Sequence, residues 1–532
     1  MPPPVPPTRP PTARTPTVTG RRPTSMAAAL AADRLGLWPV FFFAVSAMTP
    51  LTVVAGAVPI GYGQIRETSI PVAYASMAAV MAVFAVGFVA MARRIPNAGA
   101  FYTYVARGLS RPLGVGAAGV ALAAYNAIQI ALYGGFGFAA GGVMASLGVQ
   151  AHWGVWAAGA WVAVAWLGLL RVDLNARILG VLVLAEIGVV LVFDVVLLAH
   201  PADGVVRFDT LDPTALATAG GAAVLVGAIA GFVGAEAPVV YTEEARDPQR
   251  TIGRAVYLTL AVACVLYAGS AWAMSVATGP DRIVDEAARH GTDLFFVLPA
   301  PHLPDSVIAV AAVLFVTSLF AAMLAFHHTI ARYVFALARE RVLPASMART
   351  NRAGAPVVGS LTQTATAAVV LAGCLWAGVD PVSGLLFVAS VVGGLGILLL
   401  LTFTSIAVLA WFHRHPDGES RWRRLVAPTV ASLALTMVSL ATVAFFGDLL
   451  GVTHPALAHA APAAYLAILT TGVLWGLHLR ARRPHVYQRI GLGPHATHTH
   501  RPPTGTPPGG RHRRTTPTRP SHTPPSATGR TP

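Results

Sequence analysis

Twelve apolar stretches, separated by short polar segments, constrain the fold of this chain more than any other feature. About twenty apolar residues cross the hydrocarbon core of a bilayer as an α-helix. Helices satisfy their own backbone hydrogen bonds in lipid, so the pattern predicts an all-α integral membrane protein with about twelve transmembrane helices. The stretches are residues 38–62, 70–92, 113–145, 153–170, 174–199, 213–242, 253–277, 305–336, 356–377, 382–412, 425–449 and 459–480.

Composition agrees with a protein that lies in a lipid bilayer. Of the 532 residues, 55% are hydrophobic and only 11% are charged, whereas a soluble protein has about 25% charged residues. The net charge of +15 could indicate nucleic-acid binding. However, the charges form short clusters between apolar stretches and in the two ends of the chain. We therefore expect no nucleic-acid partner.

The distribution of arginine predicts how the chain is oriented. All 37 basic residues are arginines, and cytoplasmic loops collect basic residues. If the N-terminus is cytoplasmic, the cytoplasmic segments hold 33 arginines and the external loops hold 4. This split predicts an even number of spans with both termini in the cytoplasm.

Both ends of the chain are rich in Pro, Thr and Arg, and the C-terminal end also contains many His residues. Segments with so little to bury are typical of disorder. We expect disordered tails over residues 1–30 and 484–532, and one transmembrane domain over residues 31–483. Basic tails of this kind suit anionic lipid headgroups.

The first span contains a predicted break at Thr49–Pro50. Thr is a good helix N-cap, Pro is favoured at the first position of a helix, and Pro50 cannot continue the hydrogen bonds of the preceding helix. The pair therefore indicates the end of one half-helix and the start of another. The alternative is a simple proline kink.

The sixth span contains a second predicted break around Glu236. Gly231, Gly234 and Pro238 crowd its middle, and a carboxylate in mid-membrane costs roughly 2.5–3.5 kcal/mol on insertion scales. Such a residue is a candidate functional group. The alternative is a structural Glu that ties the loosened backbone together, and the two roles are compatible.

Two broken spans, placed five spans apart, are typical of transporters built from inverted repeats. Free N–H groups at the start of a half-helix attract a carboxylate, and free C=O groups at the end of another attract an ammonium. A site that offers both suits a zwitterion.

Three stretches resemble the amino acid–polyamine–organocation family of permeases. They are PNAGAFYTYVARGLSRPLG from Pro96, GFVGAEAPVVYTEEARDPQRTI from Gly231, and RYVFALARERVLP from Arg332, which is followed by GAP. The family commonly has Gly-Phe-Glu where this chain has Gly234, Ala235 and Glu236. The glycine-rich break common in the first span of the family is also missing here.

The resemblance implies a LeuT-like fold, with a five-plus-five inverted repeat and two extra helices. It also implies that the protein is a secondary active transporter of the plasma membrane and not an enzyme. Residues 31–483 would then form a permease domain that moves amino acids. The expected substrate-binding residues are Ala47, Met48, Thr49, Pro50, Leu51, Thr52, Asn126, Phe232, Val233, Gly234, Ala235 and Glu236. The amides of Met48 to Thr52 would meet the substrate carboxylate, and carbonyls near Phe232 and Val233 would meet its amino group.

Candidates for ion coupling lie on the fifth and eighth spans. Glu186 is surrounded by apolar residues in its span, and a buried carboxyl group can exchange a proton near neutral pH. Thr317 and Ser318 lie where sodium-coupled relatives place hydroxyl ligands. The alternative is that their hydroxyls bond back to the preceding turn of the helix. The coupling ion is therefore a proton or sodium. We expect Asp194, two turns beyond Glu186, to be solvated near the outer face.

Other function classes receive less support from the sequence. It contains no zinc-protease motif, nucleophile motif, phosphate-binding loop or metal-ligand spacing, so we expect no enzyme, cofactor or metal site. A polyamine or other organic-cation transporter, or an amino-acid exchanger, on the same fold remains the alternative. Since a polyamine site would need additional carboxylates, and Glu186 and Glu236 are the only central candidates, the sequence favours proton-coupled amino-acid uptake.

Overall fold

The computed structural model describes residues 30, 33–170, 172–217, 219–352, 354–416, 418–450 and 455–493. The expected N-terminal tail, apart from Leu30, and residues 494–532 of the expected C-terminal tail lie outside these ranges. The described part is helical, and an isolated parallel β-bridge joins Leu35 and Ala245.

Ten described helices or helical runs are long and apolar enough to cross a membrane, and the shorter α7 and the pair α9 and η5 stand at the other two predicted spans. The first span comprises α1 (Leu37–Met48), α2 (Pro50–Thr52), η1 (Val53–Ala57), α3 (Val58–Ile60) and η2 (Gly61–Ile65). The others are α4 (Ile70–Arg94), α6 (Arg111–Ser146), α7 (Trp153–Leu167), α8 (Val172–Ala199), α9 (Ala219–Ala230) with η5 (Ala237–Tyr241), α10 (Pro248–Thr278), α13 (Asp305–Arg339), α14 (Val357–Trp376), η9 (Pro381–Ala389) with α15 (Ser390–Arg414), η10 (Trp422–Val426) with α16 (Ala427–Ala444), and α18 (Pro455–Arg482).

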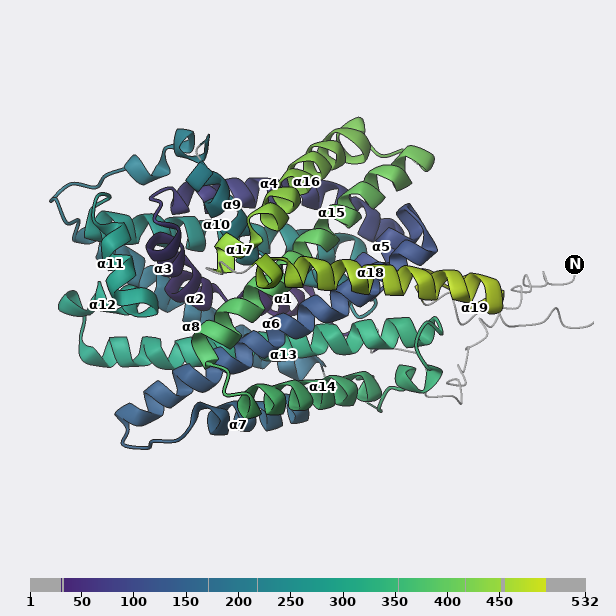
Figure 1. Ribbon diagram of the computed structural model, residues 1–532, viewed down its shortest axis with the longest axis horizontal. Helices are drawn as coiled ribbons and strands as arrows, with labels where there is room; N and C mark the ends of the chain where they lie inside the picture. Colours follow the sequence, from purple (N-terminus) through teal and green to yellow (C-terminus); the bar gives the residue numbers. More distant parts are fainter. Residues whose placement is uncertain are drawn as a thin grey trace, which may run out of the picture. The chain divides into compact units, whose positions relative to one another are not determined.

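Short helices connect these spans. They are α5 (Ala100–Gly108), η3 (Asp209–Leu211), η4 (Pro213–Ala217), α11 (Ile283–His290), η6 (Gly291–Asp293), α12 (Leu294–Val297), η7 (Ala300–His302), η8 (Ala345–Ala348), α17 (Phe446–Leu450) and α19 (Pro484–Tyr487). Within the membrane bundle, the 36-residue α6 packs against α13, α15 and α18 (Figure 1). Its length exceeds that of a simple span, which implies that α6 is tilted or extends past the bilayer.

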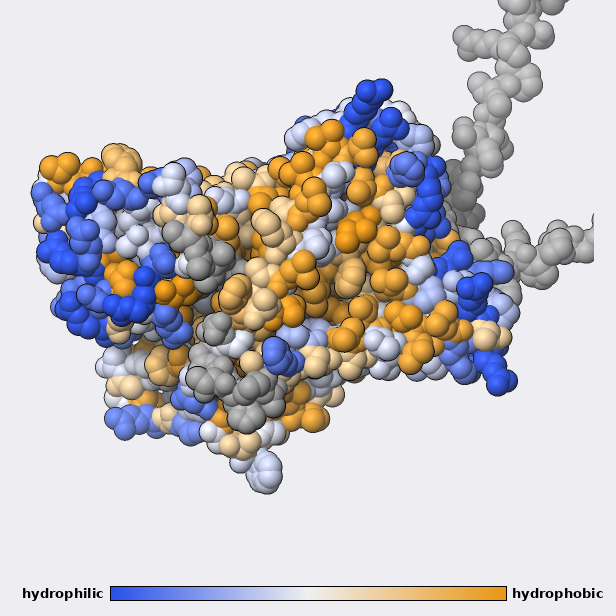
Figure 2. Space-filling view, turned by 45° about the horizontal axis from the view of Figure 1, so that its top comes forward, coloured by the Kyte–Doolittle hydropathy of each residue, from blue (hydrophilic) through white to orange (hydrophobic). Residues whose placement is uncertain are grey.

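The surface matches a lipid environment. On the face shown in Figure 2, hydrophobic residues cover the middle and hydrophilic residues gather toward both ends. Large apolar side chains are exposed, including Trp376 at 91% and Val369 at 73%. A soluble protein would bury such residues, whereas lipid tails solvate them.

Contacts between loops form two groups, one on each side of the bundle. On the side that we call arginine-rich, Arg94 pairs with Glu419 at 3.5 Å and the Arg246 N–H donates to the carbonyl of Leu35 at 2.9 Å. On the arginine-poor side, three salt bridges join other loops, namely Arg66–Asp285 at 3.1 Å, Arg207–Asp281 at 3.0 Å and Arg282–Asp203 at 3.1 Å. Each set joins loops that the arginine distribution assigned to one side.

Buried ion pairs fasten the segment after the sixth span to α13. The Arg332 guanidinium donates to Glu244 at 2.5 and 2.9 Å, and both side chains are 1% exposed. Arg339 makes the same kind of double contact with Glu243 at 2.6 and 2.7 Å. Bidentate Arg–carboxylate pairs are geometrically specific, so they fix the position of residues 243–244 against α13.

The C-terminal segment after α18 also packs on the arginine-rich side. Glu340, the residue that caps α13, is fully buried and accepts hydrogen bonds from the N–H groups of Gly491 at 2.6 Å and Gly493 at 2.7 Å. The same carboxyl group accepts from Asn97 at 3.2 Å and from the Tyr102 hydroxyl. The expected disordered tail began at residue 484, but residues 484–493 form part of the folded unit.

We predict that Glu340→Gln destabilises the protein. The substitution places an amide N–H₂ group against donors that now meet a carboxylate oxygen, and an unsatisfied buried donor costs about 1–3 kcal/mol. Thermal unfolding of the purified protein in detergent should show a lower midpoint for Glu340→Gln. The control is Asp285→Asn, because Asp285 lies in an exposed pair whose loss costs little. An unchanged midpoint for Glu340→Gln would show that this network does not stabilise the fold.

Candidate functional site

The first span breaks at Thr49, as predicted. Thr49 adopts a left-handed conformation with φ of +46°, its N–H donates to the carbonyls of Val45 and Ser46, and Pro50 begins α2. A non-glycine residue in this region of backbone space is strained. The Thr49 side chain makes no capping hydrogen bond, so the break rests on Pro50 and on the turn of the backbone.

The sixth span breaks over residues 231–236, again as predicted. Helix α9 ends at Ala230, the next six residues form successive turns, and η5 begins at Ala237. Gly234 has φ of +108°, a conformation that side chains disfavour. The turns hold their own backbone, since the Ala235 N–H donates to Phe232 and the Ala237 N–H donates to Gly234.

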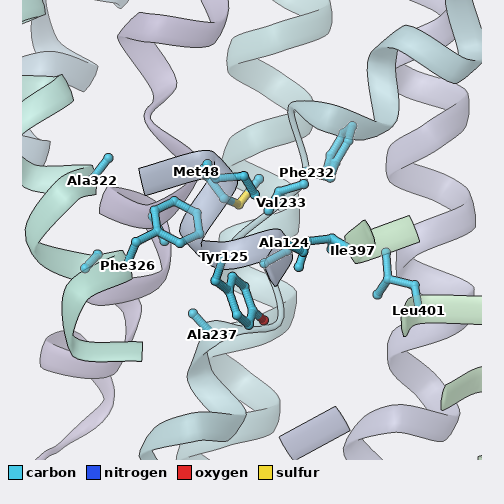
Figure 3. Packing of buried hydrophobic residues seen from close by; sticks show 14 of the residues in the cluster. Met48, Ala124, Tyr125, Phe232, Val233, Ala237, Ala322, Phe326, Ile397 and Leu401 are labelled. Atoms are coloured by element: carbon cyan, nitrogen blue, oxygen red, sulfur yellow. The ribbon is translucent and has the colours of Figure 1, made fainter. Parts of the chain in front are cut away.

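The two breaks are in contact. A Cβ atom at Gly234 would lie 2.8 Å from the backbone carbon and the Cβ of Ala47, and 3.0 Å from the nitrogen of Met48. Figure 3 shows Met48 and Val233 lying together beside Tyr125 of α6. The absence of a side chain at Gly234 therefore allows the two irregular backbones to approach closely.

Glu236 ties the second break to its surroundings. Its carboxyl group is 2% exposed and accepts the Gly234 N–H at 2.9 Å and the Tyr125 hydroxyl at 2.9 Å. These contacts match the structural role considered for this residue. They also fix the carboxyl group beside the backbone of Gly234 and the ring of Tyr125.

Aromatic side chains surround the meeting point of the breaks. The Tyr267 hydroxyl of α10 donates to the carbonyl of Met48 at 2.9 Å. Phe232 packs near Tyr267 and Tyr74, with ring centroids 5.7 and 6.3 Å away. Sequence reasoning missed Tyr125 and Tyr267. A hydroxyl-bearing ring in the middle of an apolar span was the available signal for both.

Glu186 reaches the first break from α8. It is 1% exposed, and its Oε2 accepts the Ser318 hydroxyl of α13 at 2.7 Å. The Leu51 N–H, at the start of the second half-helix, faces the same carboxyl group. The other oxygen, Oε1, is buried and has no hydrogen-bond partner. The structure thus brings together Glu186, Ser318 and Leu51.

Two predicted site residues bond within their own helices. The Thr317 hydroxyl donates to the carbonyl of Leu314 at 2.9 Å, and the Asn126 side chain donates to the carbonyl of Leu122 at 2.7 Å. Thr317 therefore does not join Glu186 and Ser318. Asn126 is half-buried and its Oδ1 has no partner, so its carbonyl oxygen is still available to a ligand.

Fewer backbone amides are free to meet a substrate carboxylate than the predicted set from Met48 to Thr52. The Thr49 N–H is engaged by α1, Pro50 has no N–H, and Met48 belongs to α1. Leu51 and Thr52 are left as donors at the start of the second half-helix. The Thr52 hydroxyl is buried without a partner, like the hydroxyl of Ser46 before the break.

The surroundings of the Asp194 side chain differ from the prediction. Its side chain is not solvated but buried, at 9% exposure, and it accepts the Ser270 hydroxyl of α10 at 2.8 Å. The prediction was wrong because Asp194 faces α10 rather than the surface, and position along a span does not specify the direction of a side chain.

Solved structures show the same fold. A manganese transporter of Eremococcus coleocola, in complex with an aromatic bis-isothiourea substituted compound, has a TM-score of 0.54 and 14% identity, covering 88% of this chain and 99% of that chain. A single-residue variant of that transporter has a TM-score of 0.52 and 13% identity, covering 85% and 94% of the two chains. These matches confirm the LeuT-like fold. Over the described residues, no group of three His, Cys, Asp or Glu side chains could hold a metal ion.

The sequence comparison gives the family. No curated protein sequence matches the chain. The family profile described as "Amino acid permease" matches residues 35–474, which includes both breaks, Glu186 and Ser318. This match confirms the resemblance carried by the three stretches, and the chain belongs to the amino acid permease family of membrane transporters.

Proposed function

We propose that this permease takes up amino acids together with protons, and that Glu186 carries the coupling proton. The observation that carries the proposal is the unpartnered Oε1 of a buried Glu186 beside the first break. No arginine or histidine of the described residues pairs with this carboxyl group. A charge buried without a counter-ion is costly in a membrane, and binding of a proton removes that cost.

A proton fits this position better than sodium. A sodium site would need several oxygen ligands around one point, and the hydroxyl of Thr317 is turned away to Leu314. Ser318 supplies one hydroxyl to Glu186. A single carboxyl group with one hydroxyl partner is sufficient for a proton.

The same geometry couples the proton to the substrate. An ionised Glu186 would be attracted to the Leu51 N–H at the start of the second half-helix. The carboxylate of an amino acid would use that half-helix terminus as well, and two like charges cannot share it without cost. Protonation of Glu186 removes the repulsion and releases the amide of Leu51, so the proton would bind before the substrate.

The opposite end of the substrate would face the second break. The backbone carbonyls near Phe232 and Val233, with Glu236 held beside them by Tyr125, form a negative region for an ammonium group. A polyamine would need more carboxylates, but both oxygens of Glu236 already accept hydrogen bonds. These features support a zwitterionic amino acid. We further propose that the protein lies in the plasma membrane. Its arginine-rich side would face the cytoplasm.

Uptake into proteoliposomes tests this function. Radiolabelled amino acids and polyamines would be offered in turn, with an inward proton gradient, a sodium gradient or no gradient. We expect accumulation of at least one amino acid that depends on the proton gradient. Accumulation of polyamines alone, or dependence on sodium alone, would contradict the proposal.

We predict that Glu186→Gln uncouples transport from protons. Glutamine resembles the protonated acid and cannot release a proton, so substrate should still bind but its uptake should no longer respond to the proton gradient. The matched control is Thr317→Ala on α13, which removes a hydroxyl bonded only within its own helix. Proton-driven uptake by the Glu186→Gln variant at the wild-type level would exclude Glu186 as the proton carrier.

We predict that Gly234→Ala prevents substrate binding. The added methyl group would overlap the backbone of Ala47, and the positive φ adds strain of about 1–3 kcal/mol. The substrate-induced rise in melting temperature should therefore disappear. Gly227→Ala on α9 is the control, because its Cβ would meet only the Ile65 side chain, at an ordinary 3.6 Å. A wild-type response from Gly234→Ala would show that close contact between the breaks is not required.

A further inference from the structure

Asp194 is a second buried carboxyl group that the site described above does not use. Its Oδ2 accepts the Ser270 hydroxyl at 2.8 Å, and its Oδ1 is buried without a hydrogen-bond partner. Ser270 is itself fully buried. The arrangement repeats that of Glu186, where one oxygen accepts a serine hydroxyl and the other has no partner.

No charged partner among the described residues pairs with Asp194. On α10 it meets Ser270, and the nearest titratable side chain of that helix along the chain is Tyr267, one turn away. Helices α1 and α2, which also pack against α8, carry no titratable side chain. Helix α13 packs there too and carries Asp305, His327, His328, Arg332, Tyr333 and Arg339. Of these, Asp305 begins α13 at the arginine-poor side, and the other five follow Ser318 toward the arginine-rich end.

Asp194 lies between Glu186 and the arginine-poor end of α8. It follows Glu186 by eight residues, which places it about 12 Å further along the helix axis. Beyond it, α8 ends at Ala199, and His200 stacks on His302 with ring centroids 3.6 Å apart. Asp194 is thus the next carboxyl group that a proton from this side would meet before Glu186.

Helix α10 provides hydroxyl groups between the two acids. Ser270 contacts Asp194, and Tyr267 lies one turn away toward the breaks, where its hydroxyl donates to the Met48 carbonyl. Tyr267 is also close enough to Glu186 for the two to interact electrostatically. Helix α10 therefore carries two polar side chains, Ser270 and Tyr267, between Asp194 and the first break, where Glu186 lies.

We propose that Asp194 is a second proton-binding site, which passes protons between the arginine-poor side and Glu186. In each transfer, the proton leaves the carboxylic acid of Asp194 and arrives at the carboxylate of Glu186. The pair therefore still holds one acid and one carboxylate. Asp194 then regains a proton from the solution. The delivery of protons from Asp194 to Glu186 rests on the proposed function of proton-coupled uptake. The binding of a proton by Asp194 is independent of that function.

A comparison of two transport modes tests the relay. Asp194→Asn should cause a loss of uptake driven by an inward proton gradient, because asparagine keeps a hydrogen bond to Ser270 but carries no proton. Exchange of internal for external amino acid at equal pH needs no net proton movement and should stay at the wild-type level. Asp212→Asn is the matched control, since Asp212 is an exposed acid on the same side of the bundle. Proton-driven uptake by Asp194→Asn at the level of Asp212→Asn would overturn the relay.

A second measurement does not depend on transport. Infrared difference spectra of the purified protein, recorded during a pH titration, report carboxyl groups that gain a proton. Asp194→Asn should remove one carboxylic-acid band and Glu186→Gln a different one. Asp194→Glu should restore a band at a shifted frequency. If Asp194→Asn removes no band, Asp194 does not titrate. If the bands behave as expected but no amino acid is transported, the proposed function fails and the proton site stands.

Discussion

Close contact between two irregular backbones in mid-membrane is the constraint on which the rest of the site depends. Lipid offers no hydrogen bonds, so a helix can break there only where other groups of the protein or a ligand satisfy the backbone. Gly234 permits the contact because it has no side chain to separate the second break from Ala47 and Met48. The Tyr267 hydroxyl satisfies the Met48 carbonyl at this point, and Glu236 satisfies the Gly234 N–H.

The breaks were predictable because their causes are local. Pro50 cannot continue a helix, and Gly234 accepts a positive φ, whatever surrounds them. The number of spans likewise follows from the length of apolar stretches. The burial of Asp194 was not predictable in this way. A helix exposes its side chains in all directions, and only the packing of α8 against α10 determines that Asp194 meets Ser270 rather than lipid or water.

The same limit explains the other differences between expectation and structure. Thr317 and Ser318 are neighbours in sequence, but they point about 100° apart on a helix, and only Ser318 reaches Glu186. The role of Glu340 depends on residues 491–493, which lie far away in sequence within a segment whose composition resembles a disordered tail. Composition describes what a segment can bury alone, and it does not include a partner that the fold supplies.

Two pairs of buried carboxyl groups in this protein are held in different ways, and the consequences differ. Glu243 and Glu244 each bind an arginine through two hydrogen bonds, so their charge is compensated and the contact fixes the backbone. Glu186 and Asp194 each accept a serine hydroxyl instead of an arginine, and one oxygen of each has no partner. A carboxyl group held in this way is stable in the membrane when it carries a proton and is costly when it does not. The arginine pairs therefore suit a fixed scaffold on the arginine-rich side, while the hydroxyl-bound acids suit groups that change charge during transport.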